Sequence, residues 1–283
     1  MADSRSCNYC GNAFHSSADR CPHCANPGLF PNLFAAEQVD EINALEKRYN
    51  SAVAEAISRG AGDSLSAFES ALTNSRAVIA RSAREVLRLA TSDNEIYGTY
   101  YNLIGAGLRL PEGNKWDALR AVVDSAMFLN YKEQIRFAAL SLDGVGLSPW
   151  GECSMTLRSN MIAHRTSVFE ENSVLFMKHH NIRIAESDQL PAGYRATWEN
   201  RIQLCVAKLA RRIDSSTRPE EYSAVLLRLG ATREQDEFVE VHIWGPMTVR
   251  TLEEVTLTQP KSVNRAILKT MRTKLEEANV RLS

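Results

Sequence analysis

The sequence contains no hydrophobic run approaching the roughly 18–20 residues that a membrane-spanning helix needs, and its start, MADSRSCNYC, lacks the apolar core of a secretory signal. It also lacks an excess of either charge, because 33 Lys and Arg stand against 34 Asp and Glu, for a formal net charge of −1. Any nucleic-acid binding must therefore use a local basic patch. These absences together predict a cytoplasmic protein without membrane contact.

Several motifs that mark common enzyme classes are missing as well. There is no GxxxxGKS or GxxxxGKT phosphate loop, no strand–GxGxxG–helix unit, no GxSxG and no HExxH. Most kinase, dinucleotide-fold and hydrolase functions are thereby excluded. The chain has 283 residues, of which 44% are apolar and 24% charged, an ordinary globular composition with room for about two domains.

Cysteine is scarce except at the N-terminus. Four of the six cysteines lie within the first 24 residues, whereas Cys153 and Cys205 are isolated. In a cytosol that keeps thiols reduced, a tight cluster of four indicates a metal site rather than a disulfide framework. The four form two CxxC pairs, each of which can bend into a tight turn and aim two thiolates at one ion. The pattern predicts a structural zinc site made of Cys7, Cys10, Cys21 and Cys24.

Residues 1–30 resemble the zinc-ribbon class, in which knuckles of the CPxC type recur, as at Cys21-Pro-His-Cys24. His15 and His23 lie nearby, but four sulfurs already complete a tetrahedral site. The zinc either serves only to fold a segment too short to bury a core, or it supports a head that binds protein or nucleic acid. Tyr9 and Phe14 are accordingly expected either to pack on the knuckles or to stack on bases.

Helical patterns dominate the chain between a linker at 25–34 and residue 130. Gly60 and Gly62 separate the first predicted helix from the second. None of these segments carries chemistry by its spacing. The predicted helices are 35–57, roughly 64–90, a segment from Asp93 to 105–107, and 115–128.

After Tyr131 the pattern changes to short runs of β-branched and aromatic residues bounded by turn residues, which favours strands. The predicted fold class is therefore α+β, with a zinc ribbon at 1–30, a helical middle region at 35–130 and a C-terminal mixed α/β domain at 131–283. The predicted strands are 135–142, 153–157, 162–169, 173–177, 222–229 and 238–244, and helices are predicted at 195–213 and 260–277.

Two stretches of the second half carry polar side chains at strand spacing. In Glu240-Val-His-Ile-Trp-Gly-Pro246, alternation puts Glu240, His242 and Trp244 on one face of a strand. This face either lines a cleft or is the solvated side of an edge strand. The second stretch, MIAHRTSVFEENS at 161–173, combines many hydrogen-bonding side chains with β-branched and aromatic residues, which suits a phosphorylated ligand or a polar edge.

The order of these features resembles the ADP-ribosyltransferase superfamily, in particular its bacterial toxin and effector branches. A strand with an arginine is followed by a strand rich in Ser and Thr, then a helix, then a late strand with a glutamate before an aromatic-Gly-Pro turn. The resemblance covers about residues 131–258. It implies an ADP-ribosyltransferase-like fold that cleaves NAD and transfers ADP-ribose to a macromolecule.

The resemblance also implies roles for individual residues. Glu240 would be the catalytic glutamate, whose charge stabilises the oxocarbenium-like transition state beside the scissile nicotinamide bond. Thr166 and Ser167 would match the Ser-Thr-Ser strand, and Ser173 is a competing match. Phe169 would stack on nicotinamide. The NAD-contacting set is completed by His242 and by three candidates for the phosphate-binding arginine, Arg136, Arg158 and Arg165.

The match is incomplete at two points. No full Ser-Thr-Ser run is present, and Phe238 stands where many members carry Gln or Glu two residues before the catalytic glutamate. Because that position helps to select the acceptor, a protein-arginine acceptor is disfavoured and a nucleic-acid acceptor is slightly favoured over protein. The zinc ribbon and the helical region would hold this acceptor or an inhibitory partner protein.

A non-catalytic zinc-ribbon protein is the alternative function. In that case the ribbon and the helical region bind a protein or nucleic-acid partner, and Glu240 has no chemical role. Under either function, phosphate-facing surfaces are expected on two basic helices, although a solvated helix face explains the same charges. The basic residues are Arg201, Lys208, Arg211 and Arg212 in one helix and Arg265, Lys269, Arg272 and Lys274 in the other.

Overall fold

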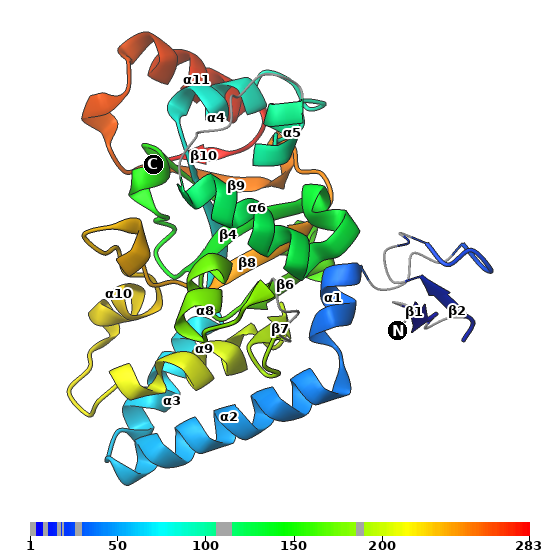
Figure 1. The fold of residues 1–283 in the computed structure, drawn as a ribbon. Coiled ribbons are helices and arrows are strands. Elements are labelled where there is room, and N and C mark those ends of the chain that lie inside the picture. The colour runs from blue at the N-terminus through cyan, green and yellow to red at the C-terminus, as the bar shows by residue number, and fades with distance from the viewer. Residues whose placement is uncertain are drawn as a thin grey trace.

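The computed structural model describes residues 4–7, 11–15, 18, 20–25, 30–105, 115–184 and 190–283. The fold is of the α+β class, with helices packed around one mixed sheet of eight strands (Figure 1). Its strand order is β10-β9-β5-β3-β4-β8-β6-β7. All neighbouring strands are antiparallel except β10 and β9, which are parallel. A separate antiparallel pair, β1 and β2, belongs to the N-terminal head.

The elements have the following bounds. The strands are β1 (Ser4–Ser6), β2 (Ala13–His15), β3 (Arg76–Arg81), β4 (Ile135–Ser141), β5 (Cys153–Leu157), β6 (Thr166–Phe169), β7 (Arg195–Thr197), β8 (Glu240–Trp244), β9 (Leu252–Leu257) and β10 (Arg281–Leu282). The α-helices are α1 (Pro31–Ala36), α2 (Val39–Ser58), α3 (Gly62–Leu72), α4 (Ala83–Leu89), α5 (Tyr100–Gly105), α6 (Lys115–Phe128), α7 (Ser159–Ile162), α8 (Ser173–His179), α9 (Arg201–Leu209), α10 (Tyr222–Leu226) and α11 (Arg265–Glu277).

The sheet is covered on both faces, and β8 shows how its residues divide between them. Val241 and Ile243 belong to the larger core, which α2, α3 and α9 cover toward the β7 end and α4 and α11 toward the β10 end. Trp244 belongs to a smaller core on the opposite face, built with α6 and α8, which lie in front of the sheet in Figure 1. Strand alternation therefore places Glu240 and His242 beneath α6 and α8.

Several predicted elements are confirmed. The helix predicted at 115–128 is α6, the strands predicted at 135–142 and 153–157 are β4 and β5, and β8 lies within the predicted 238–244. The helix predicted at 35–57 is divided between α1 and α2, and that at 260–277 contains α11. Within the described residues, no helix is both long and apolar enough to cross a membrane.

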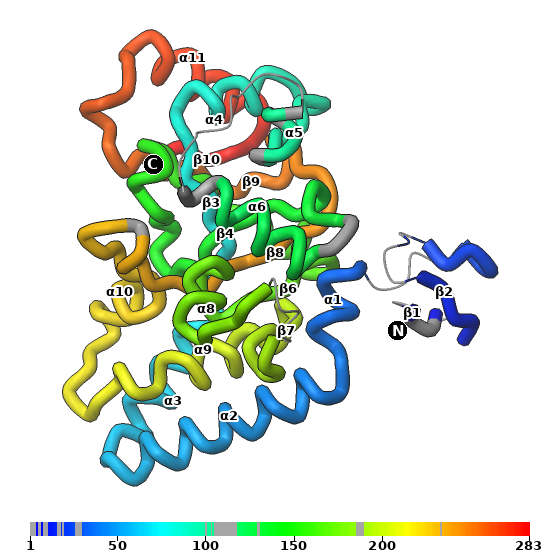
Figure 2. Tube along the Cα trace, in the orientation of Figure 1, coloured from blue at the N-terminus to red at the C-terminus, as the bar shows by residue number. Residues whose placement is uncertain are grey.

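The helix predicted at 64–90 was wrong in its middle part, where the chain forms β3 between α3 and α4. The run Ala77–Ala80 is buried on both sides, and such a short apolar run fits helical and strand spacing equally well. β3 pairs with both β4 and β5, and Figure 2 shows it beside β4 at the centre of the molecule. Residues 35–130 and 131–283 therefore contribute to one sheet and to the cores on both of its faces.

Two predicted strands are helices in the structure. The segment predicted as a strand at 173–177 is α8, which begins after Asn172 because this side chain accepts hydrogen bonds from the amides of Val174 and Leu175. The segment at 222–229 contains α10, whose buried residues Tyr222 and Leu226 are four positions apart.

Two further elements are shorter than predicted. Only residues 166–169 of the predicted strand 162–169 form β6, because the chain first turns through α7 and a 3-10 helix at Ala163–Arg165. The helix predicted at 195–213 begins with β7 and continues as α9 after an intervening bend.

Candidate functional site

The N-terminal head brings three of the four predicted zinc ligands together. The sulfurs of Cys7, Cys21 and Cys24 all lie within 4.8 Å of one another, and those of Cys7 and Cys24 are 3.6 Å apart. Two thiolates on one tetrahedral zinc, at Zn–S distances of about 2.3 Å, would be about 3.8 Å apart. The three thiols are therefore spaced as ligands of a single metal ion. Cys10 lies outside the described residues.

The two halves of the head are built alike. The amide of Gly11 donates to the Cys7 carbonyl at 2.8 Å, and the amide of Ala25 donates to the Cys21 carbonyl at 2.8 Å. Both donors adopt positive φ angles, 72° and 56°, and each directly follows the second cysteine of its pair. The two CxxC segments thus end in the same turn, in which Cys10 and Cys24 hold equivalent positions in the sequence.

The other residues named in the head have separate roles. Phe14 is buried against Cys7 and Cys21, so it packs on the knuckles and offers no free face for a base. His15 and His23 are exposed, and neither belongs to the group of metal-binding side chains found among the described residues of the head. Tyr9 lies outside those residues.

The second candidate site is the face of the sheet beneath α6 and α8. Glu240 and His242 of β8 point to this face, as predicted, but they are not on an edge strand, because β8 lies between β4 and β6. The antiparallel register pairs Ser167 with His242 and Phe169 with Glu240, so both β6 side chains share the same face. The sheet therefore brings together Glu240, His242, Ser167 and Phe169.

Glu240 is 2% exposed and makes three polar contacts. One carboxylate oxygen accepts from Arg120 Nη1 at 2.8 Å. The other oxygen accepts from the backbone amide of Ser173 at 3.1 Å and lies 3.0 Å from His242 Nε2. Ser173 is the first residue of α8, so the carboxylate lies at the start of that helix.

Three members of this network, Arg120, Asp124 and Tyr101, were missed by sequence analysis. Arg120 Nε donates to an Asp124 carboxylate oxygen at 3.1 Å, and the Tyr101 hydroxyl donates to the same oxygen at 2.8 Å. Arg120 and Asp124 are four residues apart on α6 and so lie on one side of the helix. That spacing was visible in the sequence, but nothing there showed that this side of α6 faces the sheet.

Burial and charge act against each other in this network. Burial opposes ionisation of Glu240, but the Arg120 guanidinium and the His242 ring outweigh it and lower the pKa of Glu240 to about 2. Burial would also lower the pKa of Arg120, but Asp124 and Glu240 raise it above its usual value. Burial dominates at Asp124 and raises its pKa. Glu240 is therefore a carboxylate and Arg120 a cation at neutral pH.

Aromatic rings surround the charged groups. The Arg120 guanidinium carbon lies 3.8 Å from the centroid of the Phe137 ring. The Phe128 ring meets His242 edge-on at 4.9 Å between centroids, and Phe169 stacks beside His242 at 6.0 Å. These rings exclude water and strengthen the electrostatic interactions of Glu240 and Arg120.

Helix α1, which follows the head, inserts a side chain at the edge of this face. Asn32 is buried, and its Nδ2 donates to Ser167 Oγ at 3.3 Å and to the His242 carbonyl at 3.1 Å. Beside it the Phe30 ring stacks on Trp244, with centroids 6.0 Å apart. The segment between the head and α2 is thus bound directly to the strands that carry His242 and Ser167.

The predicted phosphate-binding arginines are not brought together with Glu240. The register pairs Arg136 with Ile243, which places Arg136 on the opposite face of the sheet from Glu240. Thr166 also pairs with Ile243, and its hydroxyl donates to the Ile162 carbonyl at 2.7 Å. Arg158 follows β5 and donates to the Asn279 carbonyl at 2.9 Å.

The last two predicted residues, Arg165 and Ser173, lie before and after β6 in the chain. Arg165 precedes β6 and its guanidinium donates to the Pro246 carbonyl at 2.9 Å and to the Trp244 carbonyl. Ser173 lies beside Glu240, and its buried hydroxyl has no hydrogen-bond partner. Of the three residues predicted to match the Ser-Thr-Ser strand, Ser167 and Ser173 lie on the Glu240 face, whereas Thr166 does not.

The two basic helices differ from each other. In α9, Lys208 is half-buried and donates to the carbonyls of Glu170 and Phe238 at 2.6 and 2.9 Å. Arg211 and Arg212, which follow α9, are exposed and pair with Glu55 and Glu237. In α11, Arg265, Lys269 and Arg272 are exposed and form no ion pair with the described residues.

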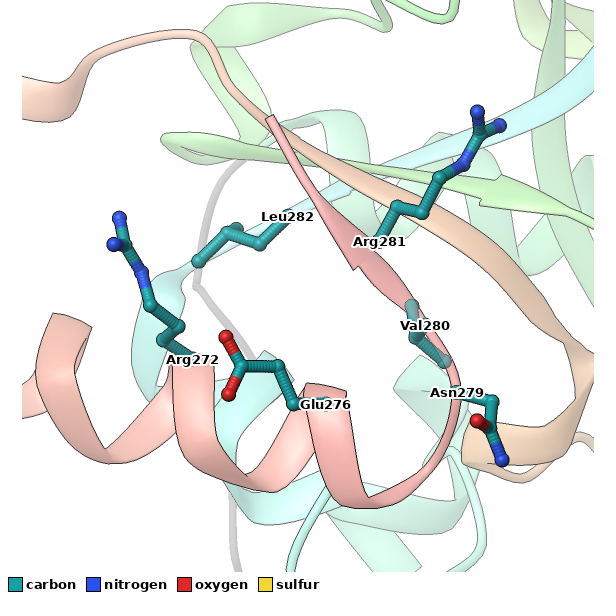
Figure 3. A pocket seen from close by; sticks show the side chains of 6 residues that line it. All are labelled: Arg272, Glu276, Asn279, Val280, Arg281 and Leu282. Carbon is teal, nitrogen blue, oxygen red and sulfur yellow. The ribbon is translucent and has the colours of Figure 1, made fainter.

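A pocket lies between α11 and β10 (Figure 3). It contains none of the Glu240 network, and its Arg281 is paired with Glu254 at 3.0 Å. Its lining residues are Arg272, Glu276, Asn279, Val280, Arg281 and Leu282.

Two comparisons with known proteins found no match. No family model matches the chain, and no curated protein is significantly similar to it.

Proposed function

We propose that the protein is an NAD-dependent ADP-ribosyltransferase that acts from the Glu240 face of its sheet, in the manner of a toxin or effector. The observation that carries the proposal is the ionised, buried carboxylate of Glu240, which shares one face with Ser167, Phe169, Ser173 and His242. A fixed negative charge in a water-poor site is suited to stabilising a positively charged oxocarbenium ion. Perturbed ionisable groups of this kind are enriched at functional sites.

The residues beside Glu240 would contact different parts of NAD. The unpartnered Ser173 hydroxyl and the Ser167 hydroxyl would bind the ribose, and Phe169 would form the apolar wall against nicotinamide. Glu240 would contact the ribose hydroxyl next to the scissile bond. His242 holds one Glu240 oxygen and thereby orients the carboxylate.

We assign the phosphate-binding role to Arg120 rather than to Arg136, Arg158 or Arg165. Arg120 contacts Glu240 on the correct face of the sheet, and its side chain is 20% exposed, so it reaches from the buried carboxylate toward solvent. An arriving diphosphate would compete with Glu240 for this guanidinium, because both are bidentate anionic acceptors. Substrate binding would thus release the carboxylate from its ion pair.

The head would hold one structural zinc through Cys7, Cys10, Cys21 and Cys24. The three described thiols have the spacing of ligands on one ion, and Cys10 holds in its CxxC pair the sequence position that Cys24 holds in the other. The chemistry of four thiolates suits zinc and leaves no open position for catalysis. With α1, the head would present a macromolecular acceptor, nucleic acid in preference to protein, or an inhibitory partner protein.

A non-catalytic, partner-binding zinc protein is the second candidate function. It is favoured by one observation, that both Glu240 oxygens are already engaged by Arg120, Ser173 and His242. A buried network of this kind can also serve only to fix α6 and α8 on the sheet.

A screen for acceptors of ADP-ribose distinguishes the transferase from the non-catalytic zinc protein. The protein is incubated with NAD and, in parallel, with RNA, DNA or cell-lysate protein, and each acceptor is analysed by mass spectrometry for an added ADP-ribose. The transferase function predicts the adduct on one acceptor class and free nicotinamide in equal amount. Absence of both products with every acceptor would leave the non-catalytic function.

A further inference from the structure

Arg136 is a buried cation without a counter-charge in the part of the chain that the structure describes. Its residue is 5% exposed, and its Nη1 donates to the Gln134 carbonyl at 2.7 Å. Its Nε is buried and has no hydrogen-bond partner. No described carboxylate forms an ion pair with Arg136. Burying an arginine in this way is unfavourable unless an anion compensates its charge.

The Gln134 carbonyl that accepts from Arg136 also accepts from the Gly245 amide at 2.8 Å, in the turn after β8. Arg165 is half-buried and contacts the same turn. Its guanidinium contacts only backbone carbonyls, those of Met161, Trp244 and Pro246, and none of the described carboxylates. Gly245, at φ 78°, turns the last two of these carbonyls toward it, and a Cβ there would lie 3.3 Å from Arg165 Nη1. The turn after β8 therefore fixes the guanidinium in place.

Tyr97 adds a hydroxyl to the two guanidinium groups. It is 6% exposed, its backbone amide donates to the Met247 carbonyl at 2.8 Å, and its buried hydroxyl has no hydrogen-bond partner. Tyr97 and Arg136 interact electrostatically. The buried Arg136 Nε, which has no hydrogen-bond partner, and the buried Tyr97 hydroxyl, which interacts with Arg81, thus lie near the turn after β8 to which Arg165 donates.

The pKa values of Arg136 and Arg165 reflect the removal of their charges from water. Burial, and then the charge of Arg165, lower the pKa of Arg136 to about 10. Burial also lowers the pKa of Arg165. Arg81 lies over the Tyr97 ring at 5.2 Å, but its charge is partly balanced by Glu85 at 3.8 Å. The cluster therefore has an uncompensated positive charge.

We propose that Arg136, Arg165 and Tyr97 form a binding site for a phosphate group, on the face of the sheet opposite Glu240. Two guanidinium groups and a phenol supply enough donors for a tetrahedral oxyanion, and planar guanidinium groups bind phosphate in a bidentate manner. The site is independent of the proposed transferase function, because none of its three residues is among the groups that contact Glu240. The phosphate would be either free phosphate or part of a nucleotide or a nucleic-acid chain.

Isothermal titration calorimetry on the full chain in phosphate-free buffer tests the proposal. The titrants are inorganic phosphate, adenosine monophosphate and a short single-stranded oligonucleotide, so that the three sources of the phosphate group are distinguished. Binding of at least one titrant with one site per chain is expected. Variants that change only Arg136 or Tyr97 separate this site from the proposed phosphate contact of Arg120 on the Glu240 face.

Three variants complete the experiment. Arg136→Leu should weaken binding by about tenfold or more, the effect of losing a charge-assisted hydrogen-bond partner, and should raise the melting temperature in phosphate-free buffer because an unpaired buried charge is removed. Tyr97→Phe retains the ring and should weaken binding severalfold, so it tests the site even if Arg136→Leu does not fold. Arg84→Leu, at an exposed arginine of α4, is the matched control and should bind normally.

Two results would overturn the proposal. One is that the wild-type protein binds none of the three titrants at millimolar concentration. The other is that Tyr97→Phe and Arg136→Leu bind as tightly as Arg84→Leu, which would leave both arginines as structural donors to the turn after β8.

Discussion

At the residue scale, Glu240 combines two properties that usually exclude each other, full burial and a stable negative charge. Arg120, the Ser173 amide and His242 together replace the water that the carboxylate loses. Such a charge is held in place before any substrate arrives, which is what electrostatic stabilisation of a transition state requires. The same contacts make Glu240 part of the packing between β8, α6 and α8.

Glu240→Gln tests both roles of this residue. The amide removes the charge that pairs with Arg120, so we expect a loss of about 2–3 kcal/mol of unfolding free energy in urea titrations, below the range for a fully broken buried pair because Asp124 still pairs with Arg120. Glu237→Gln is the matched control, because Glu237 forms only surface ion pairs, and it should lose less than about 1 kcal/mol. Equal losses in the two variants would contradict the buried ion pair.

The depressed pKa of Glu240 predicts how stability depends on acidity. The contribution of its charge is fully present above pH 4.5, the ordinary value, and is lost as the pH falls toward 2, the pKa in the folded protein. By linkage this amounts to about 3 kcal/mol over that interval. Asp124 acts in the opposite direction, because burial raises its pKa and its protonation favours the folded state.

The measurement is the difference in unfolding free energy between wild type and Glu240→Gln as the pH is lowered. The difference should shrink below pH 4.5, since the variant has no carboxylate to protonate. A difference that stays constant would show that the Glu240 charge does not stabilise the fold.

Part of this site could be predicted residue by residue and part could not. Strand alternation alone placed Glu240 and His242 on one face, and the structure confirms it. Arg120 was not predictable as their partner, because its contact with Glu240 joins positions 120 residues apart in the chain. The opposite placement of Arg136 follows from the register of β4 with β8, which the sequence does not specify.

At the scale of elements, the start of α8 positions the candidate site. Asn172 caps this helix by accepting hydrogen bonds from the amides of Val174 and Leu175 at 3.1 and 3.3 Å. The cap orients the next amide in the chain, that of Ser173, toward Glu240. The segment was predicted as a strand because its apolar run is short and buried, and the cap was not recognised as a helix start.

Asn172→Ala tests this arrangement. Loss of an N-cap side chain should lower the unfolding free energy by about 1 kcal/mol. Asn264→Ala removes the corresponding cap of α11, where Asn264 accepts from the Ala266 amide at 2.8 Å, and should lose a similar amount. Only Asn172→Ala should also lower the rate of nicotinamide release, since of the two capped helices α8 contacts Glu240 and α11 does not. Equal effects of both variants on that rate would argue against a role for α8 in the site.

The central strand β3 shows why the arrangement of elements was predicted only in part. Its apolar residues are buried on both faces, so they show no alternation, and they follow α3 after only a short turn. The residue types in this run fit a helix and a strand equally well. Its pairing with β4 and β5 depends on strands that are distant in the sequence. Helix α6 has 14 residues, a length that favours a helix over a strand, and it was predicted at its observed bounds.

At the scale of the whole molecule, the head and the sheet are joined by a short connection. Asn32 and Phe30 bind the segment after the head to β6 and β8, beside the Glu240 face. A macromolecule bound by the head would therefore be delivered near the proposed transferase site. The cysteine pattern predicted that Cys7, Cys21 and Cys24 lie together, whereas the contacts of Asn32 with β6 and β8 had no signal in the sequence.

Metal analysis tests the head directly. Purified protein should contain about one zinc per chain, and Cys21→Ser combined with Cys24→Ser should lose it. The eight-stranded sheet and the helices that cover it have their own hydrophobic cores. This part of the double variant should therefore unfold at the same urea concentration as in wild type. Full zinc content in the double variant would show that the ligands lie elsewhere.

The central claim, that Glu240 carries a transferase reaction, is tested most directly by the rate of nicotinamide release from NAD in wild type and Glu240→Gln, measured in the presence of the acceptor and under conditions where both proteins are folded. The account predicts that the variant is slower by about 10²–10³, the usual effect of removing one group that stabilises the transition-state charge, while Glu237→Gln is unchanged. A Glu240→Gln rate equal to that of wild type would contradict the account.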